Sequence, residues 1–478
     1  MNTLLTIAAA EWRYWRRSRL ALAAAALFFM LLLVTVVLTS LRVQAERDER
    51  LHHQQEAEQT FIDQPDRHPH RMVHYGHYVF RTPSPLAVFD PGLDPVTGQS
   101  IFLEGHRQNS ATFADSAASA DLGGLARLTP AVVYQLFGAL LVMLLGHGAM
   151  VREREAATLA PMLAQGVTGT QLLLGKALAL LGAIAIMLLP LLGAVIGAVP
   201  RGETLAAGLA LAATYLMYLC VWGLLTLLFS ALLSRRSTVL AVLTGLWLSL
   251  SLLLPSLATN FTARSLPIAG QIETDLTMLA DLRRLGDGHN AQDPAFAQLR
   301  SELLQRYDAD SVEELPVNWR GVVAEYSEAR LTETLNEYAE ARMAQEAAQA
   351  ALLARHGWLT PFLATATASR ALAATDLDHH QRFLREAEAL RIDFVQGLNR
   401  LHAQELSYEA DTNRNRDAEA ARRARVSADN WQLLREFRYA PLDPFARLAN
   451  AGPSLTALAA WFAALAIAVT LIGRRLSP

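Results

Sequence analysis

The histidines of this chain are its best candidates for a chemically active site, because several of them lie close to acidic residues along the sequence. Two groups combine imidazoles with carboxylates: His74, His77, Glu104 and His106, and then Asp376, His379 and His380. Imidazole nitrogen suits Zn²⁺ and Cu²⁺, so these residues form a candidate transition-metal site. Their spacing matches no standard zinc motif. Polar contacts that brace an irregular loop against a helix are the alternative interpretation.

The sequence offers little for nucleophilic catalysis or nucleotide binding. Cys220 is the only cysteine and lies in an apolar run, so no internal disulfide and no cysteine-based metal site are expected. No serine stands in a nucleophile elbow. Gly175-Lys176 resembles the end of a phosphate-binding loop, but Ala177 replaces the required Ser or Thr and the earlier glycine is missing. We therefore expect no catalytic residues and no cofactor held by this chain.

Composition excludes nucleic-acid binding and points to a membrane. The formal net charge is -3, and no basic domain is present. Hydrophobic residues make up 52% of the chain and charged residues 18%. A soluble protein would carry about a quarter charged residues, so long apolar segments must account for the difference.

Six apolar runs are long enough to cross a bilayer, which takes about 20 residues. They are Leu20–Leu41, Pro130–Met150, Leu172–Val199, Thr204–Leu233, Thr238–Ala258 and Pro453–Ile472. The first run is longer than the apolar core of a cleaved secretory signal, which has about 7–15 residues, so we expect it to stay as an anchor. Basic residues flank the runs in four groups that fall on one side if the runs alternate. By the positive-inside rule, both termini are cytoplasmic.

This topology places short segments in the cytoplasm and long segments outside. The cytoplasmic parts are residues 1–19, 151–171, 234–237 and 473–478, and the extracytoplasmic parts are residues 42–129 and 259–452. Residues 1–19 have the pattern of an interfacial helix, with arginines opposite an apolar arc formed by Leu4, Leu5, Ala8, Trp12 and Trp15. An ordinary charged lead-in to the first span is the alternative.

The outer segments predict helices with a small irregular or β element. Arg42–Gln59 should continue the first span outward. Tyr78–Arg81 and Gln99–Leu103 alternate like short strands within a stretch rich in Pro and Gly. Trp319–Arg355 and Leu377–Arg435 should be helical, separated by a stop signal at residues 357–361, whereas residues 270–315 look irregular. The predicted fold class is an all-α membrane protein with six transmembrane helices and a largely helical extracytoplasmic domain.

The loop between the second and third spans carries a motif. It begins Arg152-Glu153-Arg154-Glu155, continues through Thr158-Leu159 and ends at Gly175-Lys176. Here the chain resembles the ABC type-2 exporter permeases, in which a segment of the form E-R-x-x-G-T-L, followed by G-K, joins these spans. Ala157 stands where that family usually has glycine. The resemblance implies a coupling helix that docks on an ATPase through Glu153, Arg154, Glu155, Thr158 and Leu159. A solvated charged turn is the alternative.

The outer segments resemble those of an uncharacterised subgroup of these permeases that has large extracytoplasmic insertions. The shared motifs are His74-Tyr75-Gly76, Ser84-Pro85-Leu86, Asp90-Pro91-Gly92, Leu103-Glu104-Gly105-His106-Arg107-Gln108, the stretch from Ser369 to Phe383, and Phe437–Pro441. The resemblance covers nearly the whole chain, except residues 270–315.

The resemblance implies a bacterial inner-membrane permease subunit, powered by two copies of a separate ABC ATPase that bind ATP and Mg²⁺. The other expected partners are a second permease copy or paralogue, membrane lipids and a periplasmic protein. Export of a hydrophobic substrate and mechanotransmission to the periplasm both remain open. Sparse polar residues in the spans and large outer segments favour mechanotransmission. A membrane-anchored periplasmic metal-binding or scaffold protein without transport is the alternative from another class.

Overall fold

The chain forms six helical segments that are long and apolar enough to cross a membrane, in a computed structural model that describes residues 3–112 and 128–476. They are α2 (Arg19–Ile62), Pro130–Glu155, α9 (Gly169–Ala198) with the turn η4 (Val199–Arg201), α10 (Leu205–Leu232), Arg236–Ser265 and α20 (Pro444–Arg475). Each of the six apolar runs coincides with one of these segments. The predicted all-α membrane fold with a small β element is confirmed.

Two of the membrane segments contain π-helical turns. Pro130–Glu155 comprises α5 (Pro130–Val132), the π turn η3 (Val133–Gly138), α6 (Ala139–Gly146) and α7 (Val151–Glu155). Arg236–Ser265 comprises α11 (Arg236–Leu248), the π turn η5 (Ser249–Leu253) and α12 (Leu254–Ser265). Such turns are often found at functional sites.

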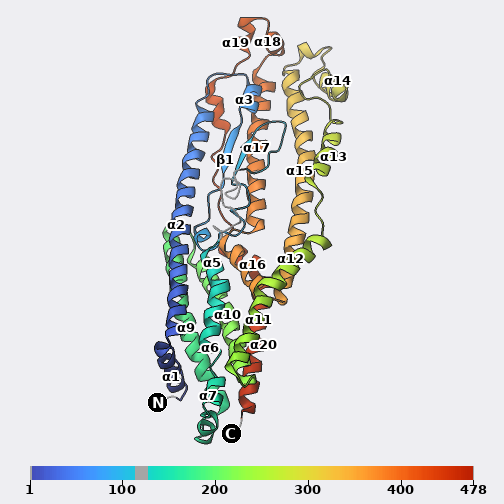
Figure 1. Ribbon diagram of the computed structural model, residues 1–478. Helices are drawn as coiled ribbons and strands as arrows, with labels where there is room; N and C mark the ends of the chain where they lie inside the picture. Colours follow the sequence, from blue (N-terminus) through green and yellow to red (C-terminus); the bar gives the residue numbers. More distant parts are fainter. Residues whose placement is uncertain (1–2, 113–127, 477–478) are drawn as a thin grey trace.

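The N-terminal helix α1 (Thr3–Arg17) packs mainly on α9, at the same end of the molecule as the C-terminus (Figure 1). Ser18 separates it from α2, and its side chain caps the start of α2. The predicted apolar arc differs from the face that packs: Ile7, Ala8, Glu11 and Trp15 are buried, whereas Leu5 is exposed. The Trp15 indole donates to the backbone oxygen of Leu145, so this aromatic ring packs against protein.

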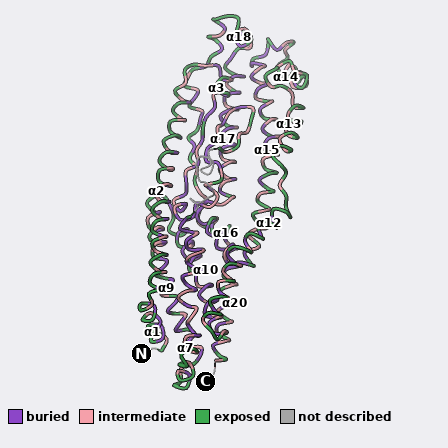
Figure 2. Tube along the Cα trace, viewed as in Figure 1, coloured by how far each residue is buried: buried purple, intermediate pink, exposed green. Residues whose placement is uncertain are grey.

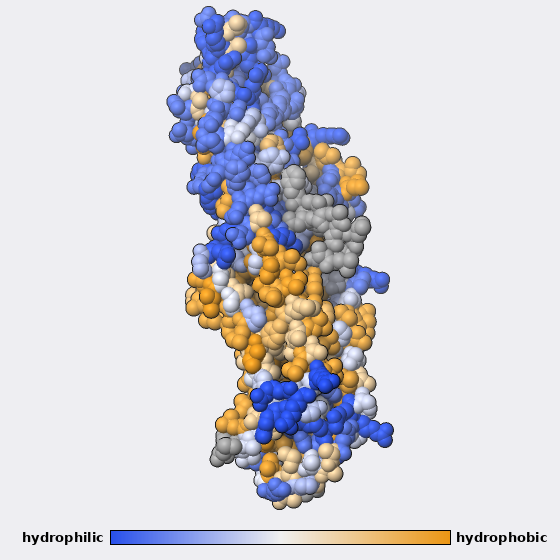
Figure 3. Space-filling model, turned by 60° about the vertical axis from the view of Figure 1, so that its left-hand side comes forward, coloured by the Kyte–Doolittle hydropathy of each residue, from blue (hydrophilic) through white to orange (hydrophobic). Residues whose placement is uncertain are grey.

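Beyond the apolar band, α2 runs on without a break to Ile62, which agrees with the predicted outward extension of the first span. We call residues 42–112, 266–358 and 374–442 the distal domain. Figure 3 shows hydrophobic side chains in a band toward one end of the molecule and a mostly hydrophilic surface over the distal part. Lipid-facing leucines such as Leu33 and Leu38 on α2 are exposed, as expected for a helix that meets lipid.

The distal domain packs helices around a two-stranded sheet (Figure 1). Figure 2 shows that many positions along α2 are exposed. Strands β1 (His77–Phe80) and β2 (Ser100–Leu103) are antiparallel, with His77 opposite Leu103. The long helices α15 (Trp319–Arg355) and α17 (Leu377–Glu405) pack together, and α3 (Pro69–Tyr75) lies on α17. The distal core includes Phe61, Phe383, Phe394 and Trp431. The chain returns to the spans through α16 (Pro361–Ala373), which packs on α10 and α20.

Two predictions of secondary structure differ from the structure at helix ends. Leu377–Arg435 was expected to be helical, and it is divided among several helices: α17 ends at Glu405, and Ser407 and Asp417 cap the short helices α18 (Tyr408–Asn413) and α19 (Ala418–Arg423) before the turn η9 (Ala428–Leu433). Residues 270–315 were expected to be irregular, but they form α13 (Gln271–Leu282) and α14 (Ala297–Tyr307). Gly and Asp mark helix ends there, as caps do.

Candidate functional site

The loop after the second span is held by a buried cluster of charges, which we call the loop charge cluster: Glu11, Arg152, Glu153 and Lys176. Lys176 is 2% exposed and Glu11 is 3% exposed. The Lys176 Nζ atom lies 2.5 Å from Glu11 Oε1 and 3.0 Å from Glu153 Oε1, and Arg152 Nη2 also lies 2.5 Å from Glu11 Oε1. The cluster therefore ties α7 to α1 and α9. The close approach of Gly175 to Ile7, where a Cβ atom would lie 2.7 Å away, brings α1 and α9 together.

The other charged residues of the loop motif bond to neighbouring spans. Arg154 donates to the backbone oxygens of Ala231 and Leu233, which lie at the end of α10 and lack helical partners. Glu155 accepts from the backbone N–H and the guanidinium of Arg236 at the start of α11, a favourable place for a negative charge. The Thr158 hydroxyl donates to the Glu153 carboxylate. The motif thus links the loop to four neighbouring helices of its own chain.

One side of the loop remains exposed. It consists of Glu155–Thr158, Ala160, Pro161 and the residues Ala164–Gly166 around the end of α8 (Leu159–Ala164). Ala157 has a φ of 56°, a left-handed conformation that costs a residue with a Cβ atom about 1 kcal/mol or more. This explains why glycine is usual at the position in the permeases that the loop resembles.

A buried chain of hydrogen bonds joins the spans to the distal part of the molecule. Gln135 in η3 donates to the hydroxyl of Tyr215 over 2.9 Å, and Tyr215 donates to Ser369 over 3.0 Å. Ser369 in turn donates to the carboxylate of Asp90. Burial raises the pKa of the Asp90 carboxyl above its usual value. Gln135 and Tyr215 in the spans thus connect to Asp90 and Ser369, which belong to two of the motifs quoted above. We call this contact region between the spans and the distal domain the junction.

A buried ion pair lies at the same junction. Arg447 in α20 donates through Nη1 to both carboxylate oxygens of Glu203 at 3.1 Å and to the backbone oxygen of Leu372 in α16. Both side chains are at most 5% exposed. Gly92 of the Asp90-Pro91-Gly92 motif has a φ of 51°, and a Cβ atom there would lie 2.3 Å from the backbone oxygen of Thr375. These contacts fix the short connections between spans and distal domain.

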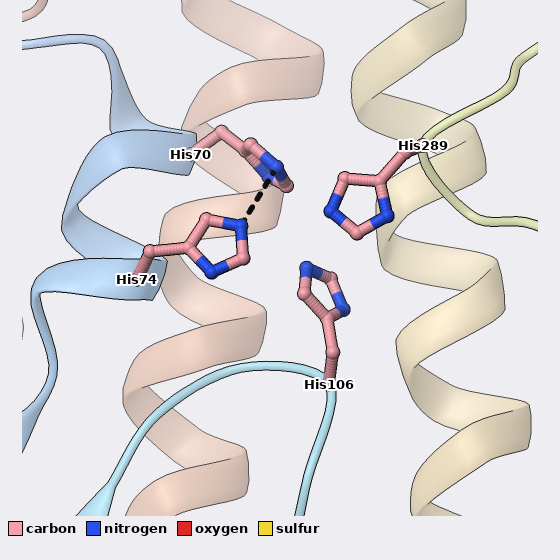
Figure 4. A group of neighbouring side chains, drawn as sticks. All are labelled: His70, His74, His106 and His289. Atoms are coloured by element: carbon pink, nitrogen blue, oxygen red, sulfur yellow. Dashed lines mark hydrogen bonds between the residues drawn. The ribbon is translucent and has the colours of Figure 1, made fainter.

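Four imidazoles of the distal domain converge, and we call them the four-histidine cluster: His70, His74, His106 and His289 (Figure 4). The first two lie one turn apart on α3, His106 follows β2, and His289 lies in the loop between α13 and α14. One ligand nitrogen from each lies within 4.8 Å of the others. Burial and the neighbouring imidazoles lower the pKa of His70 to about 2 and also lower the pKa of His74.

Of the predicted metal-binding residues, only His74 and His106 lie in the four-histidine cluster. The Glu104 carboxylate lies 3.2 Å from Arg107 Nε instead. His77 is buried beside Phe61 and Gln54, and burial lowers its pKa to about 4. The His379 ring bonds to Asp376 and accepts from the Leu442 backbone N–H, so this pair braces the start of α17. Burial and Arg81 lower the pKa of His380 to about 4.

Sequence reasoning missed His70 and His289. The spacing of His70 and His74, four residues apart on one helical face, was a usable signal. No local pattern marks His289, because its approach depends on the packing of its loop on α15. Gly288 in that loop touches Ser327, and a Cβ atom at Gly288 would lie 2.3 Å from the Ser327 hydroxyl.

A second group of histidines surrounds Asp411, and we call it the Asp411 cluster: His68, His402, Asp411 and Arg414. His402 Nε2 lies 2.8 Å and His68 Nε2 3.0 Å from the Asp411 carboxylate, which also accepts from Arg414 and Asn318. The carboxylate is fully buried. Its oxygens are taken up by these donors, and the guanidinium would repel a cation, so this group is a hydrogen-bonded network.

A third group supports His106 and is called the distal charge cluster: Glu328, Arg391 and Glu388. Arg391 uses all five of its N–H donors, to Glu328, twice to Glu388, to the Thr332 hydroxyl and to the backbone oxygen of Glu104. Glu328 also lies 2.9 Å from His106 Nδ1 and accepts from the His106 backbone N–H. Hydrogen bonds and ion pairs outweigh burial, so the pKa of Glu328 is lowered.

Taken together, a bundle of apolar spans, a short loop tied into it by charges and a large distal domain define a multi-pass membrane protein of the permease class. The model of the ABC-2 family transporter proteins matches residues 5–283, and the chain belongs to that family. A second family model, described as a domain of unknown function (DUF3526), matches residues 272–440 and so covers most of the distal helices. A search of curated proteins gave no match. The predicted ABC type-2 resemblance is confirmed.

Proposed function

We propose that the chain is the membrane half of an ATP-driven machine whose ATPase is a separate subunit, and that it transmits motion to an extracytoplasmic distal domain. Membership of the ABC-2 family supports a permease subunit with an ATPase partner. The observation that carries the mechanism is the loop charge cluster, because it links an exposed loop to α1 and α9 through buried ion pairs. In this proposal the termini and the loop are cytoplasmic, in the bacterial inner membrane.

The exposed side of the loop is the proposed docking surface for the ATPase. Glu153 and Arg154 are occupied within the chain, so charge reversal at Glu153 would set an arginine against Lys176 and Arg152 and disturb the loop itself. Ala160 is exposed and offers a cleaner test. Ala160→Trp should prevent copurification of the ATPase while six-span insertion survives. Ala348→Trp, at an exposed position on α15, is the matched control. Normal copurification and ATP turnover with Ala160→Trp would show that the loop is only a linker.

The proposed sidedness can be tested by cysteine labelling. Ser301 on α14 and Ala160 in the loop are both exposed. In a Cys220→Ala background, an impermeant thiol reagent should label Ser301→Cys from outside, and Ala160→Cys only after the inner membrane is permeabilised. The opposite pattern would overturn the proposed orientation.

We propose that the working unit contains two permeases and two ATPases. Two-fold symmetry is the default for such assemblies, and two nucleotide sites call for two docking loops. Native mass spectrometry of the active complex should give equal numbers of the two subunits. One permease with two ATPases would contradict this stoichiometry.

If motion is transmitted from the spans to the distal domain, a distance measured in the distal domain should change with the ATPase cycle. This change is a test of mechanotransmission as distinct from export. A nitroxide on Ser301→Cys in the Cys220→Ala background should report a changed distance between the two copies when ATP turnover is arrested with vanadate. Arg447→Gln removes one charge of the Arg447–Glu203 pair, so ATP turnover should persist while the distance change is reduced. An unchanged distance in the parent protein would exclude mechanotransmission.

One feature favours export of a hydrophobic substrate as a second candidate function. An apolar cavity of about 350 Å³ lies between α1, α9, α10 and α20 and is lined by Leu178, Leu224 and Phe462, among others. Filling it with Leu224→Trp should stop an exporter that uses this route, and it should leave the vanadate-dependent distance change intact in a mechanotransmitter.

A further inference from the structure

The four-histidine cluster has the dimensions of a tetrahedral metal site. Ligands about 2.0–2.1 Å from a tetrahedral metal lie about 3.3 Å from one another, and the centres of their imidazole rings then lie about 5 Å apart. The six pairs of ring centroids in the cluster are 4.6 to 5.7 Å apart. The Nε2 atoms of His70 and His74 are 3.2 Å apart. All six separations thus agree with one central ion.

The rings face a common centre with nitrogens that have few other partners. Figure 4 shows the four imidazoles arranged around one space, reached from α3, from the loop after β2 and from the loop before α14. Within the part of the chain that the structure describes, the buried Nε2 atom of His106 has no hydrogen-bond partner. His74 and His289 are exposed, so an ion can enter from solvent.

A carboxylate orients one of the rings from behind, as in carboxylate–histidine–metal arrangements. Glu328 Oε2 lies 2.9 Å from His106 Nδ1, which directs His106 Nε2 toward the centre. Ligating histidines are commonly held in their tautomer by such a partner. Asp287 lies close to His289 as well, where its Oδ1 atom accepts from the His289 backbone N–H and is 3.4 Å from the Nδ1 atom of the exposed ring.

The backbone around the cluster is strained or tightly packed where the ligands need it. His106 has a φ of 66°, a conformation that is uncommon for a residue with a side chain. The preceding Gly105 lies against α3, where a Cβ atom would be 2.1 Å from Val73 Cγ1. Backbone strain of this kind is often found at ligand sites.

The Asp411 cluster, in the same domain, is a contrasting group in which the imidazoles are used up in hydrogen bonds. The His68 and His402 rings bond to Asp411, and Arg414 adds a positive charge at the same carboxylate. In the four-histidine cluster no ring nitrogen meets an arginine or a carboxylate on the central side, among the contacts of the described residues. We propose that the four-histidine cluster binds one divalent transition-metal ion, with the tetrahedral arrangement favouring Zn²⁺.

Such an ion would fasten the loop at residues 283–296 to α3 and to the loop after β2. His289 is the contribution of the first of these segments, and His70, His74 and His106 come from parts of the chain about 200 residues earlier. Imidazole also suits Cu²⁺ and Ni²⁺, so competition between metals is part of the test. The geometry of these residues supports a metal ion without reference to the proposed ATP-driven function.

The test uses the full chain, purified in lipid nanodiscs with a histidine-free tag and treated with a chelator. Zn²⁺ titrated into the protein should bind at one ion per chain, and Co²⁺ should give the visible absorption bands of tetrahedral nitrogen coordination. His289→Gln should reduce the affinity for Zn²⁺ at least about tenfold, since even the loss of an outer-shell partner reduces metal affinity 10- to 100-fold. Glu328→Gln should weaken it by a smaller factor. Ni²⁺ and Cu²⁺ titrations then rank the metals.

The matched control is His52→Gln, which removes one exposed histidine from α2 and should leave affinity unchanged. Hydrogen exchange in residues 284–293 should slow when Zn²⁺ is added to the parent protein but not to His289→Gln, which keeps a readout even if affinity is hard to measure. The proposal is overturned if the parent protein binds no stoichiometric Zn²⁺, or if His289→Gln and His52→Gln bind it equally well. Equal binding would mean adventitious surface sites.

Discussion

The distal charge cluster and the loop charge cluster lie in different regions of the molecule. Both pair carboxylates with cations, but they differ in the number of cations that do so. In the distal cluster, Arg391 bonds to both buried carboxylates, Glu328 and Glu388, and its remaining donors go to neighbouring oxygens. Glu328 has one further contact, to His106. In the loop cluster, Lys176 and Arg152 share Glu11 and Glu153. If the single cation Arg391 is lost, Glu388 has no cation left and Glu328 keeps only His106. A shared set of cations can lose one member and still keep its carboxylates paired.

Removing the single distal cation should have the largest effect. Arg391→Met leaves the buried Glu388 carboxylate without its cation and Glu328 with only His106, and breaking a buried pair in this way costs about 3–5 kcal/mol. We expect a loss of this size in the stability of the distal domain, measured by denaturant titration with pulse proteolysis. Arg385→Met is the matched control, because the exposed pair of Arg385 and Glu340 links the same two helices. Surface pairs contribute about 0–1 kcal/mol. Equal losses in the two variants would contradict the comparison.

Acid should weaken the distal end more than the loop end, because buried histidines occur in the distal domain and the loop cluster holds none. Burial lowers the pKa of His77 from 6.5 to about 4. Between these values the unfolded chain binds a proton that the native state does not. Stability is therefore full above pH 6.5, falls as the pH drops toward 4, and this contribution then levels off. The shift corresponds to at most about 3 kcal/mol.

The measurement is hydrogen exchange of the distal helices and of α9 between pH 7 and pH 4.5, in metal-free buffer and corrected for intrinsic rates. His77→Gln should reduce the pH dependence of the distal helices, whereas His52→Gln, at an exposed position, should not. An equal pH dependence in α9 and in the distal helices would remove this contrast between the two ends.

Removing one of the two loop cations should have a smaller effect than Arg391→Met. In Lys176→Met, Glu11 keeps its contact with Arg152, so we expect a loss of about 1–3 kcal/mol, the scale of a hydrogen bond to a charged group. The double variant with Arg152→Met should lose more than the sum of the two single variants, since no cation then remains for Glu11. Thermal unfolding in nanodiscs tests this, and an additive double variant would show that the cations act separately.

The smallest effect concerns the turn between α7 and α8. Ala157→Gly removes a left-handed strain of about 1 kcal/mol but makes the unfolded chain more flexible. A net stabilisation below about 1 kcal/mol is expected, with ATPase docking unchanged. Ala156→Gly next to it, where no positive φ occurs, should be destabilising. A destabilising Ala157→Gly would show that the turn is relaxed in solution.

The spans could be predicted from sequence because each is an unbroken apolar run, which is a local property. The short strands could also be predicted to within one residue: β1 lies one residue earlier than expected and β2 begins one residue later. Arg81 and Gln99, at the ends of the expected strands, still form a backbone hydrogen bond in register with the sheet. The loop motif was found, but the partners of Glu153 and Arg154 were not. Lys176 and Glu11 lie at the edges of apolar runs, and charge in such places is a signal that was not used.

The metal candidates show where sequence reasoning stops. His74 and His106 were grouped correctly because they lie near one another in motifs. Asp376 and His379 form a helix cap, which the Asp-to-His spacing of three residues could have indicated. His289 could not have been assigned, because its distance to His70 depends on how a loop more than 200 residues later packs on α15. When the ligands of one site come from segments far apart in the chain, their spacing in the sequence gives no recognisable motif.

The uninterrupted helix α2 has a mechanical consequence. Its 44 residues span about 66 Å at 1.5 Å per residue, with no proline or glycine to act as a hinge. About half of its length lies in the first apolar run, Leu20–Leu41, and about half continues into the distal domain as far as Ile62, so it can act as a rigid lever arm. Residues 42–62 span about 30 Å, so a tilt of about 5° among the spans would move Ile62, the tip of the lever, by about 3 Å. Small rotations at the membrane are thus amplified with distance, whatever partner meets the tip.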